Sequence, residues 1–295
     1  MVTMKHSINI KGHSGCLVKV VSADGEWWVE KSALTAEYAG RLRRQIRKQR
    51  EARRANRLAS VIIPEIHSEQ ELPGGGYAVR MEYLQLRDCG EFYSTASIRG
   101  VERVAVLLLD YLEANLVQCA LRPVDAAILL HKLDSIEAKL VASGRGTLYR
   151  SLLEQVREHA GKIHGLPLPM GPNHGDLTLS NVMMAGDLSC IGLFDFLDSY
   201  LESPLVDIAK VRQDTQFGWS SLMAEDPLDR VRFMQIMRHT DAIIVRHFGA
   251  HNWFRCGIDL VQAVNLLRIA PYARTESVHR FILDAITSLE LNPCT

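Results

Sequence analysis

Three polar residues near the middle of the chain have the types and the spacing that metal-assisted phosphoryl transfer requires. Asp176 and Asn181 lie five residues apart in the segment HGDLTLSN, and Asp195 follows Asn181 by fourteen residues. A carboxylate can orient an attacking hydroxyl and take its proton, while an amide oxygen and a second carboxylate can hold a metal ion that bridges phosphates. The pattern predicts that Asp176 activates an acceptor hydroxyl, that Asn181 and Asp195 bind Mg²⁺, and that ATP is the donor.

A tight hairpin is expected between the two proposed metal ligands. The apolar segments 182–184 and 190–194 are separated by Ala185-Gly186-Asp187, a pattern typical of two short strands joined by a turn. The hairpin would place Asn181 just before one strand and Asp195 at the end of the next, side by side. The alternative is that His174, Asp176 and Asn181 are ordinary turn-forming residues of a loop. The hairpin and the strand-end carboxylate favour the chemical interpretation.

The segment HGDLTLSNVMM, followed by LFDF, resembles the catalytic-loop and metal-loop motifs of the aminoglycoside phosphotransferase and choline kinase-like branch of the protein-kinase-like superfamily. The resemblance implies that Asp176 is the catalytic base, that Asn181 and Asp195 bind Mg²⁺, and that His174 is structural. Two positions depart from the commonest form of the motifs. Thr178 stands where many members have His, and Phe194 stands where Ile or Val is usual, but neither change removes a functional group that the reaction needs.

The first residues of the chain indicate a strand-rich region that could hold the nucleotide. Strands are expected at 6–11, 17–21 and 26–32. Gly12 and Gly15 lie in the connection between the first two strands, where glycine lets backbone N–H groups approach phosphates closely. An ordinary hairpin is the competing interpretation of the two glycines.

Lys31 is the residue of this region that is expected to contact the α- and β-phosphates. Strand alternation places it on the same face as Val29, which would pack on adenine. Lys19 on the neighbouring strand is the competing candidate, and an exposed strand lysine is the alternative for both. The strand Tyr77–Leu84 includes Met81-Glu82-Tyr83-Leu84, which resembles a kinase hinge, so main-chain groups of Glu82 and Leu84 are expected to bind adenine.

A helix is expected over residues 35–58, and in kinases the helix at this place supplies a partner for the lysine. Glu51, Gln49 and Glu37 all remain candidates for that role. The same helix has nine Lys/Arg between residues 41 and 57, which could bind an anionic membrane, nucleic acid or another anionic partner. A solvated face offset by acidic residues elsewhere is favoured. The segments RLRRQIRKQ, VIIPEI and RMEYL are also similar to bacterial family members encoded with surface-polysaccharide genes.

The rest of the chain is expected to be helical, with helices at 101–118, 124–142 and 148–164, a helix that Ser203-Pro204 opens, and three more after residue 227. Asp207, in the helix that follows Pro204, is expected to brace the catalytic loop through backbone N–H groups. It lies only twelve residues after Asp195, which leaves no room for the long activation segment of protein kinases and favours a small-molecule acceptor. The acceptor candidates are Asp198, Asp214, Trp219, Trp253, Arg268, Tyr272 and Arg274. The acidic residues among them point to a cationic acceptor, and the arginines point to an anionic one.

The composition of the chain limits the kinds of partner and the cellular location that can be expected. The 295 residues include 34 basic and 34 acidic side chains, so the whole chain has no electrostatic preference for polyanions. The six cysteines are scattered, which indicates neither a zinc site nor a disulfide framework and suggests the cytoplasm. No segment has the roughly 20 apolar residues that span a bilayer.

Together, these observations predict an α+β, bilobal protein-kinase-like fold, with a small β-rich lobe at residues 1–86 and a larger helical lobe at 87–295. The expected activity is transfer of the ATP γ-phosphoryl group to a hydroxyl of a sugar, aminoglycoside or amino-alcohol. A protein kinase and a non-catalytic kinase-like module that binds an anionic partner through residues 41–57 are the alternatives.

Overall fold

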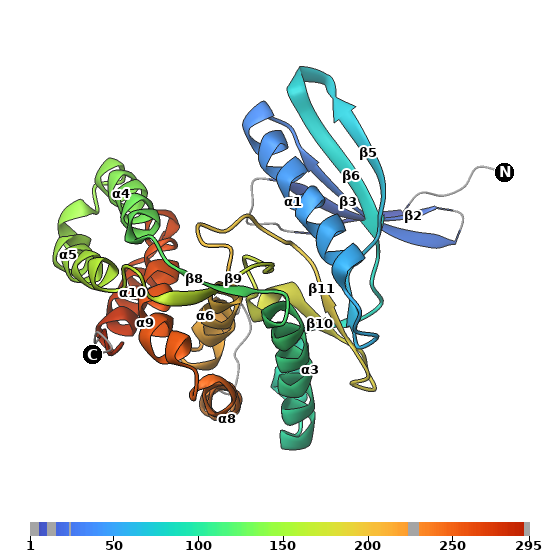
Figure 1. The fold of residues 1–295 in the computed structure, drawn as a ribbon. Helices are drawn as coiled ribbons and strands as arrows, with labels where there is room; N and C mark the ends of the chain where they lie inside the picture. The colour runs from blue at the N-terminus through green and yellow to red at the C-terminus, as the bar shows by residue number, and fades with distance from the viewer. Residues whose placement is uncertain (1–5, 11–15, 24, 224–229, 292–295) are drawn as a thin grey trace. The chain divides into compact units, whose positions relative to one another are not determined.

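The computed structural model describes residues 6–10, 16–23, 25–223 and 230–291 (Figure 1). The chain divides into two compact units, one formed by residues 1–88 and 181–198 and the other by residues 89–180 and 199–295. Gly12 and Gly15, which are predicted to approach the phosphates, lie outside the described residues.

The smaller unit contains a five-stranded antiparallel sheet in the order β1-β2-β3-β6-β5. Its strands are β1 (His6–Ile10), β2 (Leu17–Ala23), β3 (Glu26–Ala33), β5 (Ile66–Leu72) and β6 (Gly76–Glu82), with the short 3₁₀ helix η1 (Pro73–Gly75) between the last two. The strands at the start of the chain are those that the alternation of apolar residues predicts. β5 was not predicted, because its sequence IHSEQEL has no buried apolar face and most of its side chains are exposed.

Helix α1 (Ala36–Ala55) covers one face of this sheet and contacts β3 and β6 (Figure 1). The Thr35 side chain accepts a hydrogen bond from the backbone N–H of Tyr38 at the start of the helix, as an N-cap does. An apolar core forms where the helix meets the sheet, and it includes Ala33, Leu42, Ile46 and Val79. Burial of this face stabilises a helix whose average composition is strongly polar.

A second, four-stranded sheet joins the expected hairpin to the smaller unit. Its order is β4-β11-β10-β7, with β4 (Val61–Ile62), β7 (Arg87–Asp88), β10 (Val182–Met184) and β11 (Ile191–Leu193). β10 and β11 pair in antiparallel fashion, as the hairpin pattern predicts. β10 also pairs with β7, and β11 pairs with β4 in parallel. This pairing explains why residues 181–198 group with the first 88 residues, whereas the sequence places them in the larger lobe.

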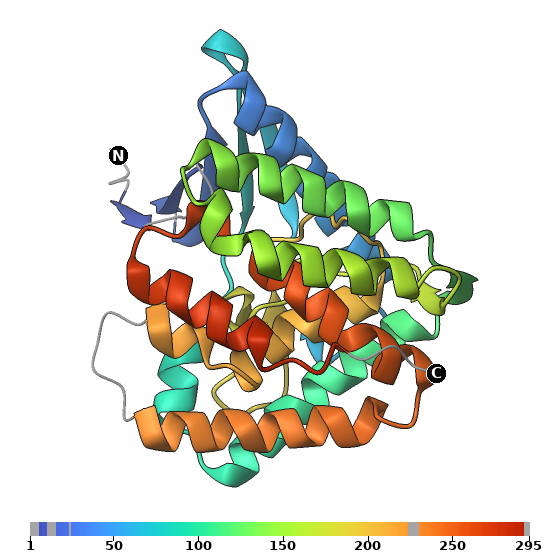
Figure 2. The ribbon, with the colours of Figure 1, turned by 90° about the vertical axis from the view of Figure 1, so that its left-hand side faces the viewer.

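The larger unit is built mainly of helices. They are α2 (Cys89–Thr95), α3 (Ile98–Leu116), α4 (Ala126–Ala142), α5 (Gly146–Lys162), α6 (Pro204–Thr215), α7 (Trp219–Met223), α8 (Arg230–Phe248), α9 (Asn252–Leu267) and α10 (Glu276–Thr287), with the 3₁₀ helix η3 (Ala270–Tyr272). A two-stranded pair, β8 (Ala120–Pro123) and β9 (Pro167–Met170), completes the unit. Figure 2 shows α4 and α5 side by side, as expected for consecutive helices joined by a short loop.

Helix α6 is the central element of the larger unit. All twelve of its residues are buried, and it packs against α8 and α9. Ser203 caps its first turn by accepting a hydrogen bond from the backbone N–H of Leu205, and Pro204 occupies the first helical position. Six of the twelve residues are polar or charged, so these side chains need partners inside the protein.

Two further observations concern the membrane and the cysteines. Among the described helices, none is both long enough and apolar enough to cross a bilayer. Cys16, Cys89, Cys119 and Cys190 form no disulfide.

Candidate active site

In the smaller unit, the ammonium group of Lys31 lies between two oxygen ligands. Its Nζ is 2.7 Å from Oδ1 of Asp195 and 3.2 Å from Oε1 of Gln45. The lysine is only 4% exposed, although the Asp195 side chain is 40% exposed. The fold therefore brings together two residues that are 164 positions apart in the sequence, and both were selected from the sequence for nucleotide and metal binding.

The helix residue that contacts Lys31 is Gln45, which corrects the expectation of Glu51, Gln49 or Glu37. Gln49 is buried as well, but its amide donates to the carbonyl oxygen of Pro64. Glu37 and Glu51 are exposed. The buried face of α1 is wider than its Leu42/Ile46 stripe and includes Gln45 at its edge. Gln45 could have been identified from the sequence as a polar residue on the buried face of this helix.

If Gln45 holds the lysine in place, we expect Gln45→Leu to raise the KM for ATP, because the buried ammonium then loses an oxygen ligand. Gln45→Glu keeps an oxygen at the same distance and strengthens the pair electrostatically, so it should retain the wild-type KM or lower it. The measurement is the steady-state KM for ATP of both variants. Equal KM values for Gln45→Leu and wild type would show that the contact has no role in nucleotide binding.

The two proposed metal ligands lie at the same end of the β10–β11 hairpin. Asn181 immediately precedes β10, and Asp195 lies two residues after β11. The strands pair Val182 with Leu193, and the backbone N–H of Phe194 donates to the carbonyl oxygen of Asn181 at 3.4 Å. Asp195 has φ of 61°, a left-handed conformation that is unusual for a residue with a side chain and is often retained at functional sites.

The chemistry of these ligands fits Mg²⁺. An amide oxygen and a carboxylate are hard ligands, and Mg²⁺ often binds through one or two protein groups and completes its shell with water and phosphate oxygens. Within the described residues, no group of three or more His, Cys, Asp or Glu side chains could form a complete protein cage. In this structure the Asp195 carboxylate pairs with the Lys31 ammonium.

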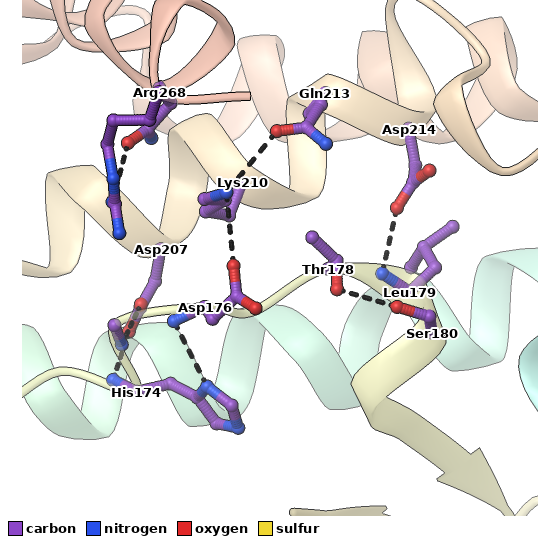
Figure 3. A network of polar contacts seen from close by, with 12 residues as sticks. His174, Asp176, Thr178, Leu179, Ser180, Asp207, Lys210, Gln213, Asp214 and Arg268 are labelled. Atoms are coloured by element: carbon purple, nitrogen blue, oxygen red, sulfur yellow. Dashed lines mark hydrogen bonds and ion pairs between the residues drawn. The ribbon is translucent and has the colours of Figure 1, made fainter. Parts of the chain in front are cut away.

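In the larger unit, Asp207 holds the start of the catalytic loop. Its two carboxylate oxygens accept hydrogen bonds from the backbone N–H groups of His174, at 2.6 Å, and Gly175, at 2.8 Å (Figure 3). Gly175 has φ of 86°, which a residue without Cβ adopts at little cost. The fully buried imidazole of His174 accepts a hydrogen bond from the backbone N–H of Asp176 through Nδ1, at 3.3 Å. This geometry is what the expected structural roles of His174 and Asp207 require.

Asp214 holds the other end of the loop, which rules out its expected contact with the acceptor. One carboxylate oxygen accepts the backbone N–H of Leu179 at 2.8 Å. The other oxygen accepts the backbone N–H and the hydroxyl of Ser220, at 2.8 and 2.6 Å. The residue is completely buried, so its carboxylate serves the fold. The sequence alone does not distinguish an aspartate that binds backbone N–H groups inside the protein from one that binds a ligand.

Lys210 is a site residue that sequence reasoning missed. Its Nζ lies 3.0 Å from Oδ1 of Asp176, and only 7% of its side chain is exposed. Asp207, Lys210 and Asp214 follow each other at i, i+3 and i+7, so they share one face of α6. Figure 3 shows this face, with Lys210 pointing toward Asp176. Lys210 could have been identified from the sequence, because three charged residues share one face of a helix that begins with Ser-Pro.

The neighbouring cation determines the ionisation of Asp176. Burial would raise the pKa of this carboxyl group, but the charge and the hydrogen bond of Lys210 outweigh that effect and hold the pKa below its ordinary value. Burial lowers the pKa of Lys210, while Asp176 opposes the shift. With its pKa below the ordinary value, the Asp176 carboxyl group is ionised at neutral pH, which is the state that the predicted base requires.

Asp207→Ala should destabilise the protein strongly, because it leaves the two backbone N–H groups without their carboxylate partner. We expect about 1–3 kcal/mol for each buried group that becomes unsatisfied. The measurement is the free energy of unfolding from urea denaturation. Asp134→Ala is the matched control, since Asp134 is 66% exposed and pairs with Arg157 on the surface, where the loss should stay below about 1 kcal/mol. Similar losses in both variants would contradict the bracing role.

The residues predicted to bind adenine make contacts within the smaller unit. The N–H of Glu82 donates to the carbonyl oxygen of Glu65, so that group is already engaged within the sheet. Leu84 is buried, and its side chain packs so close to β11 that a Cβ on Gly192 would lie 2.7 Å from it. Val29 packs against the core beneath α1. The contacts of Val29, Glu82 and Leu84 with adenine stay predictions.

Four arginines of the basic helix segment 41–57 form ion pairs with carboxylates of the smaller unit. Arg43 pairs with Glu71, Arg50 with Glu69, and Arg53 with Glu65. Lys48 donates to the carbonyl oxygen of Leu197, and Arg44 pairs with Asp198 at 2.8 Å. These contacts favour the interpretation of this helix as an internally compensated surface, and they give Asp198 a structural partner.

The other acceptor candidates lie in the larger unit. Trp253 is 8% exposed and packs in an aromatic cluster with Phe248 and Phe254, so it belongs to the core. Trp219 packs on Phe281. Tyr272 is 67% exposed, and its hydroxyl accepts a hydrogen bond from Lys139 at 3.0 Å. Arg274 is exposed. The acceptor roles of Tyr272 and Arg274 stay predictions.

Solved structures with the same fold define the class of protein. One is a thermostable mutant of aminoglycoside phosphotransferase APH(4)-Ia in complex with ADP and hygromycin B, with a TM-score of 0.61 and 12% identity over 96% of this chain and 94% of that chain. Another is APH(2")-IIia with GDP and kanamycin, with a TM-score of 0.57 and 14% identity over 97% of this chain and 92% of that chain. The bilobal, kinase-like α+β fold expected from the sequence is confirmed.

The sequence itself identifies the family. The model of the phosphotransferase enzyme family matches residues 17–232, which is most of the chain. None of the curated proteins matches the chain significantly. The chain belongs to the phosphotransferase enzyme family and is a small-molecule kinase of that class.

Proposed function

We propose that this phosphotransferase uses Mg²⁺ and ATP and phosphorylates a hydroxyl group of a small molecule through Asp176. The observation that carries the proposal is the contact between the buried Lys31 ammonium and the partly exposed Asp195 carboxylate, at 2.7 Å. It joins the residue selected for phosphate binding to the residue selected for metal binding, although the sequence separates them widely. A loop of turn-forming residues without chemical function would not require this contact.

Asp176 is the proposed base. Lys210 keeps its carboxyl group ionised and holds one of its oxygens at 3.0 Å, which limits the orientations of the side chain. A fixed carboxylate can accept the hydrogen bond of an acceptor hydroxyl and take its proton as the new O–P bond forms. The bracing of the loop by Asp207 and Asp214 supports this role, because general base catalysis depends on accurate position.

Asn181 and Asp195 are the proposed ligands of Mg²⁺, through an amide oxygen and a carboxylate oxygen. When bound, the ion would bridge the phosphates and neutralise the charge that develops during transfer. Asp176 and Asn181 lie five residues apart, so the chain keeps the two kinds of group within about 18 Å of each other at full extension.

Lys31 is proposed to bind the α- and β-phosphates, with Gln45 holding its ammonium group in position. Val29, Glu82 and Leu84 are proposed to surround adenine, the last two through their main chains. Gly12 and Gly15 are proposed to bring backbone N–H groups near the phosphates. When ATP binds, the Lys31 ammonium can replace its contact with the Asp195 carboxylate by contacts with phosphate oxygens. Both kinds of contact are charge-assisted hydrogen bonds, so the ammonium keeps an anionic partner.

The proposed acceptor is a small molecule such as a sugar, an aminoglycoside or an amino-alcohol. The separation of only twelve positions between Asp195 and Asp207 leaves no room for a peptide-docking activation segment, which argues against a protein acceptor. The similar structures contain hygromycin B and kanamycin, both small molecules. The internal pairing of the basic helix argues against a scaffold that binds a polyanion through residues 41–57.

The cytoplasm is the proposed location. It supplies ATP, and it is consistent with the four described cysteines that form no disulfide.

The test is a screen of ADP release with Mg²⁺ and ATP against sugars, aminoglycosides, amino-alcohols and nucleosides. The proposal predicts that at least one small hydroxyl compound raises ADP release above the rate without acceptor and gains one phosphoryl group by mass spectrometry. Transfer of labelled phosphate to Ser, Thr or Tyr of proteins, with none to small molecules, would favour a protein kinase. Absence of both transfer and nucleotide binding would favour a non-catalytic module.

A further inference from the structure

The surroundings of Asp176 in the larger unit are rich in positive charge. Lys210 lies against the carboxylate, and Arg268 at the end of α9 interacts electrostatically with both members of the pair. Figure 3 shows Lys210 and Arg268 on the side of the catalytic loop that faces α6 and α9. Lys210 is 6% exposed, and Arg268 is half-buried. Buried cations at a proposed base are costly unless something compensates their charge.

Arg268 is held in place by direct contacts with neutral groups. Its guanidinium group lies over the ring of Tyr200, 5.4 Å from the centroid, and donates to the amide oxygen of Asn265 at 3.3 Å. Within the described part of the chain, these neutral groups are its contacts, and no carboxylate lies within ion-pair distance. A rigid planar guanidinium is well suited to bind a phosphate or carboxylate through two parallel hydrogen bonds.

Two further cations, Lys132 and Lys139, belong to helix α4 and interact with Arg268 or with each other. Burial, together with the charges of Arg268 and Lys139, lowers the pKa of Lys132 to about 8. Lys139 itself contacts the hydroxyl of Tyr272 at 3.0 Å. The pKa of Lys132 thus responds to two cations with no carboxylate opposing them. The region from Lys210 to Lys139 carries an excess of positive charge.

The carboxylates that a cationic acceptor would need are engaged elsewhere. Asp214 is completely buried and accepts three hydrogen bonds from Leu179 and Ser220. Asp198 belongs to the smaller unit and pairs with Arg44. In the larger unit, Asp176 therefore stands among cations, which would repel an ammonium group of an acceptor and attract an oxyanion.

We propose that the acceptor carries an oxyanion, a phosphate monoester or a carboxylate, which Lys210 and Arg268 bind beside Asp176. This proposal rests on the proposed function, and it narrows the acceptor to anionic hydroxyl compounds such as sugar phosphates and sugar acids. Lys210 is a specificity-determining residue in this account, because it contacts both the base and the anion. Lys132 contributes through the field of its charge.

The test is calorimetric binding of four matched compounds, in the absence of nucleotide, to the full chain. Glucose 6-phosphate and glucuronate are the anionic probes, glucose is the neutral one, and glucosamine is the cationic one. Each is titrated into wild type, Lys210→Met, Arg268→Gln and Arg238→Met. Arg238 is an exposed arginine of α8 and serves as the matched control.

We expect an anionic probe to bind wild type more tightly than glucose and glucosamine. Its affinity should fall roughly ten- to a hundred-fold in Lys210→Met and in Arg268→Gln, the range for loss of a charged hydrogen bond. Arg238→Met should bind like wild type. Because Lys210 is buried and its replacement can disturb folding, the half-buried Arg268→Gln provides an independent reading, and thermal unfolding identifies any unfolded variant.

Three results of the binding measurements would overturn the proposal. The first is tighter binding of glucose or glucosamine than of both anionic probes, and the second is failure of both anionic probes to bind. The third is anion binding that survives in Arg268→Gln but is lost in Lys31→Met, because the anion would then occupy the nucleotide site. Phosphorylation of a neutral or cationic acceptor in preference to its anionic counterpart would leave the proposed function standing and remove this inference. Specific anion binding without any phosphoryl transfer would do the reverse.

Discussion

Asp176→Asn is expected to lower kcat by about 10²–10⁴, the usual contribution of a positioned general base. The substitution keeps the shape of the side chain but removes its negative charge and most of its basicity. It also leaves Lys210 without its carboxylate partner, so the loss should lie toward the upper end of this range. Steady-state turnover with the acceptor that the screen identifies is the measurement.

Asp187→Asn is the control for this prediction. Asp187 is an exposed carboxylate in the turn of the β10–β11 hairpin, and its side chain accepts hydrogen bonds only from Ser189 among the described contacts. An asparagine can keep these hydrogen bonds, so turnover should not change. A loss of less than about tenfold in Asp176→Asn would show that proton transfer to this residue is not important for the reaction.

Lys31→Met should raise the KM for ATP and lower turnover, with a combined loss of about 10²–10³ in kcat/KM, as for removal of one charged group that stabilises a developing anion. The buried ammonium is the group that contacts Asp195 and Gln45, and methionine fills its place without charge. Lys19→Met is the matched control, because Lys19 lies on the adjacent strand and is exposed. Lys19→Met should have no effect, because Lys19 lies opposite Glu30 and therefore on the other face of the sheet from Lys31. Equal effects of both substitutions would contradict the assignment of Lys31 to the phosphates.

The elements that carry the chemistry could be predicted because their signals are local. Alternation of side chains along β3 placed Lys31 and Val29 on one face, and the turn residues 185–187 indicated the β10–β11 hairpin. These features depend on neighbours within a few residues, where backbone geometry determines which side chains share a face.

The features that could not be predicted depend on which side chains become buried. Gln45, rather than Glu51, Gln49 or Glu37, contacts Lys31, because the contact of α1 with β3 and β6 determines which face of the helix is buried. Asp214 was expected at the acceptor, but its carboxylate holds the backbone of Leu179. Lys210 was overlooked for the same reason, since a helix with six polar residues in twelve gives no sign that all of them are buried.

The pairing of strands that are far apart in the sequence could not be predicted either. β10 pairs with β7, about 95 residues earlier, and this pairing assigns the hairpin to the smaller unit. β9 contains two prolines, which read as a break in the sequence, yet it forms a short strand with β8. Proline is tolerated there because a two-stranded pair has only edge strands.

The central claim is that two aspartates have different partners, Asp176 the acceptor and Asp195 the metal. Calorimetric titration of ATP in the presence and absence of Mg²⁺, with wild type, Asp176→Asn and Asp195→Asn, tests it most directly. Asp176→Asn should bind Mg-ATP with near wild-type affinity despite its loss of turnover. Asp195→Asn should lose most of the increase in affinity that Mg²⁺ provides. Loss of nucleotide binding in Asp176→Asn, together with unchanged Mg²⁺-dependent binding in Asp195→Asn, would contradict the account.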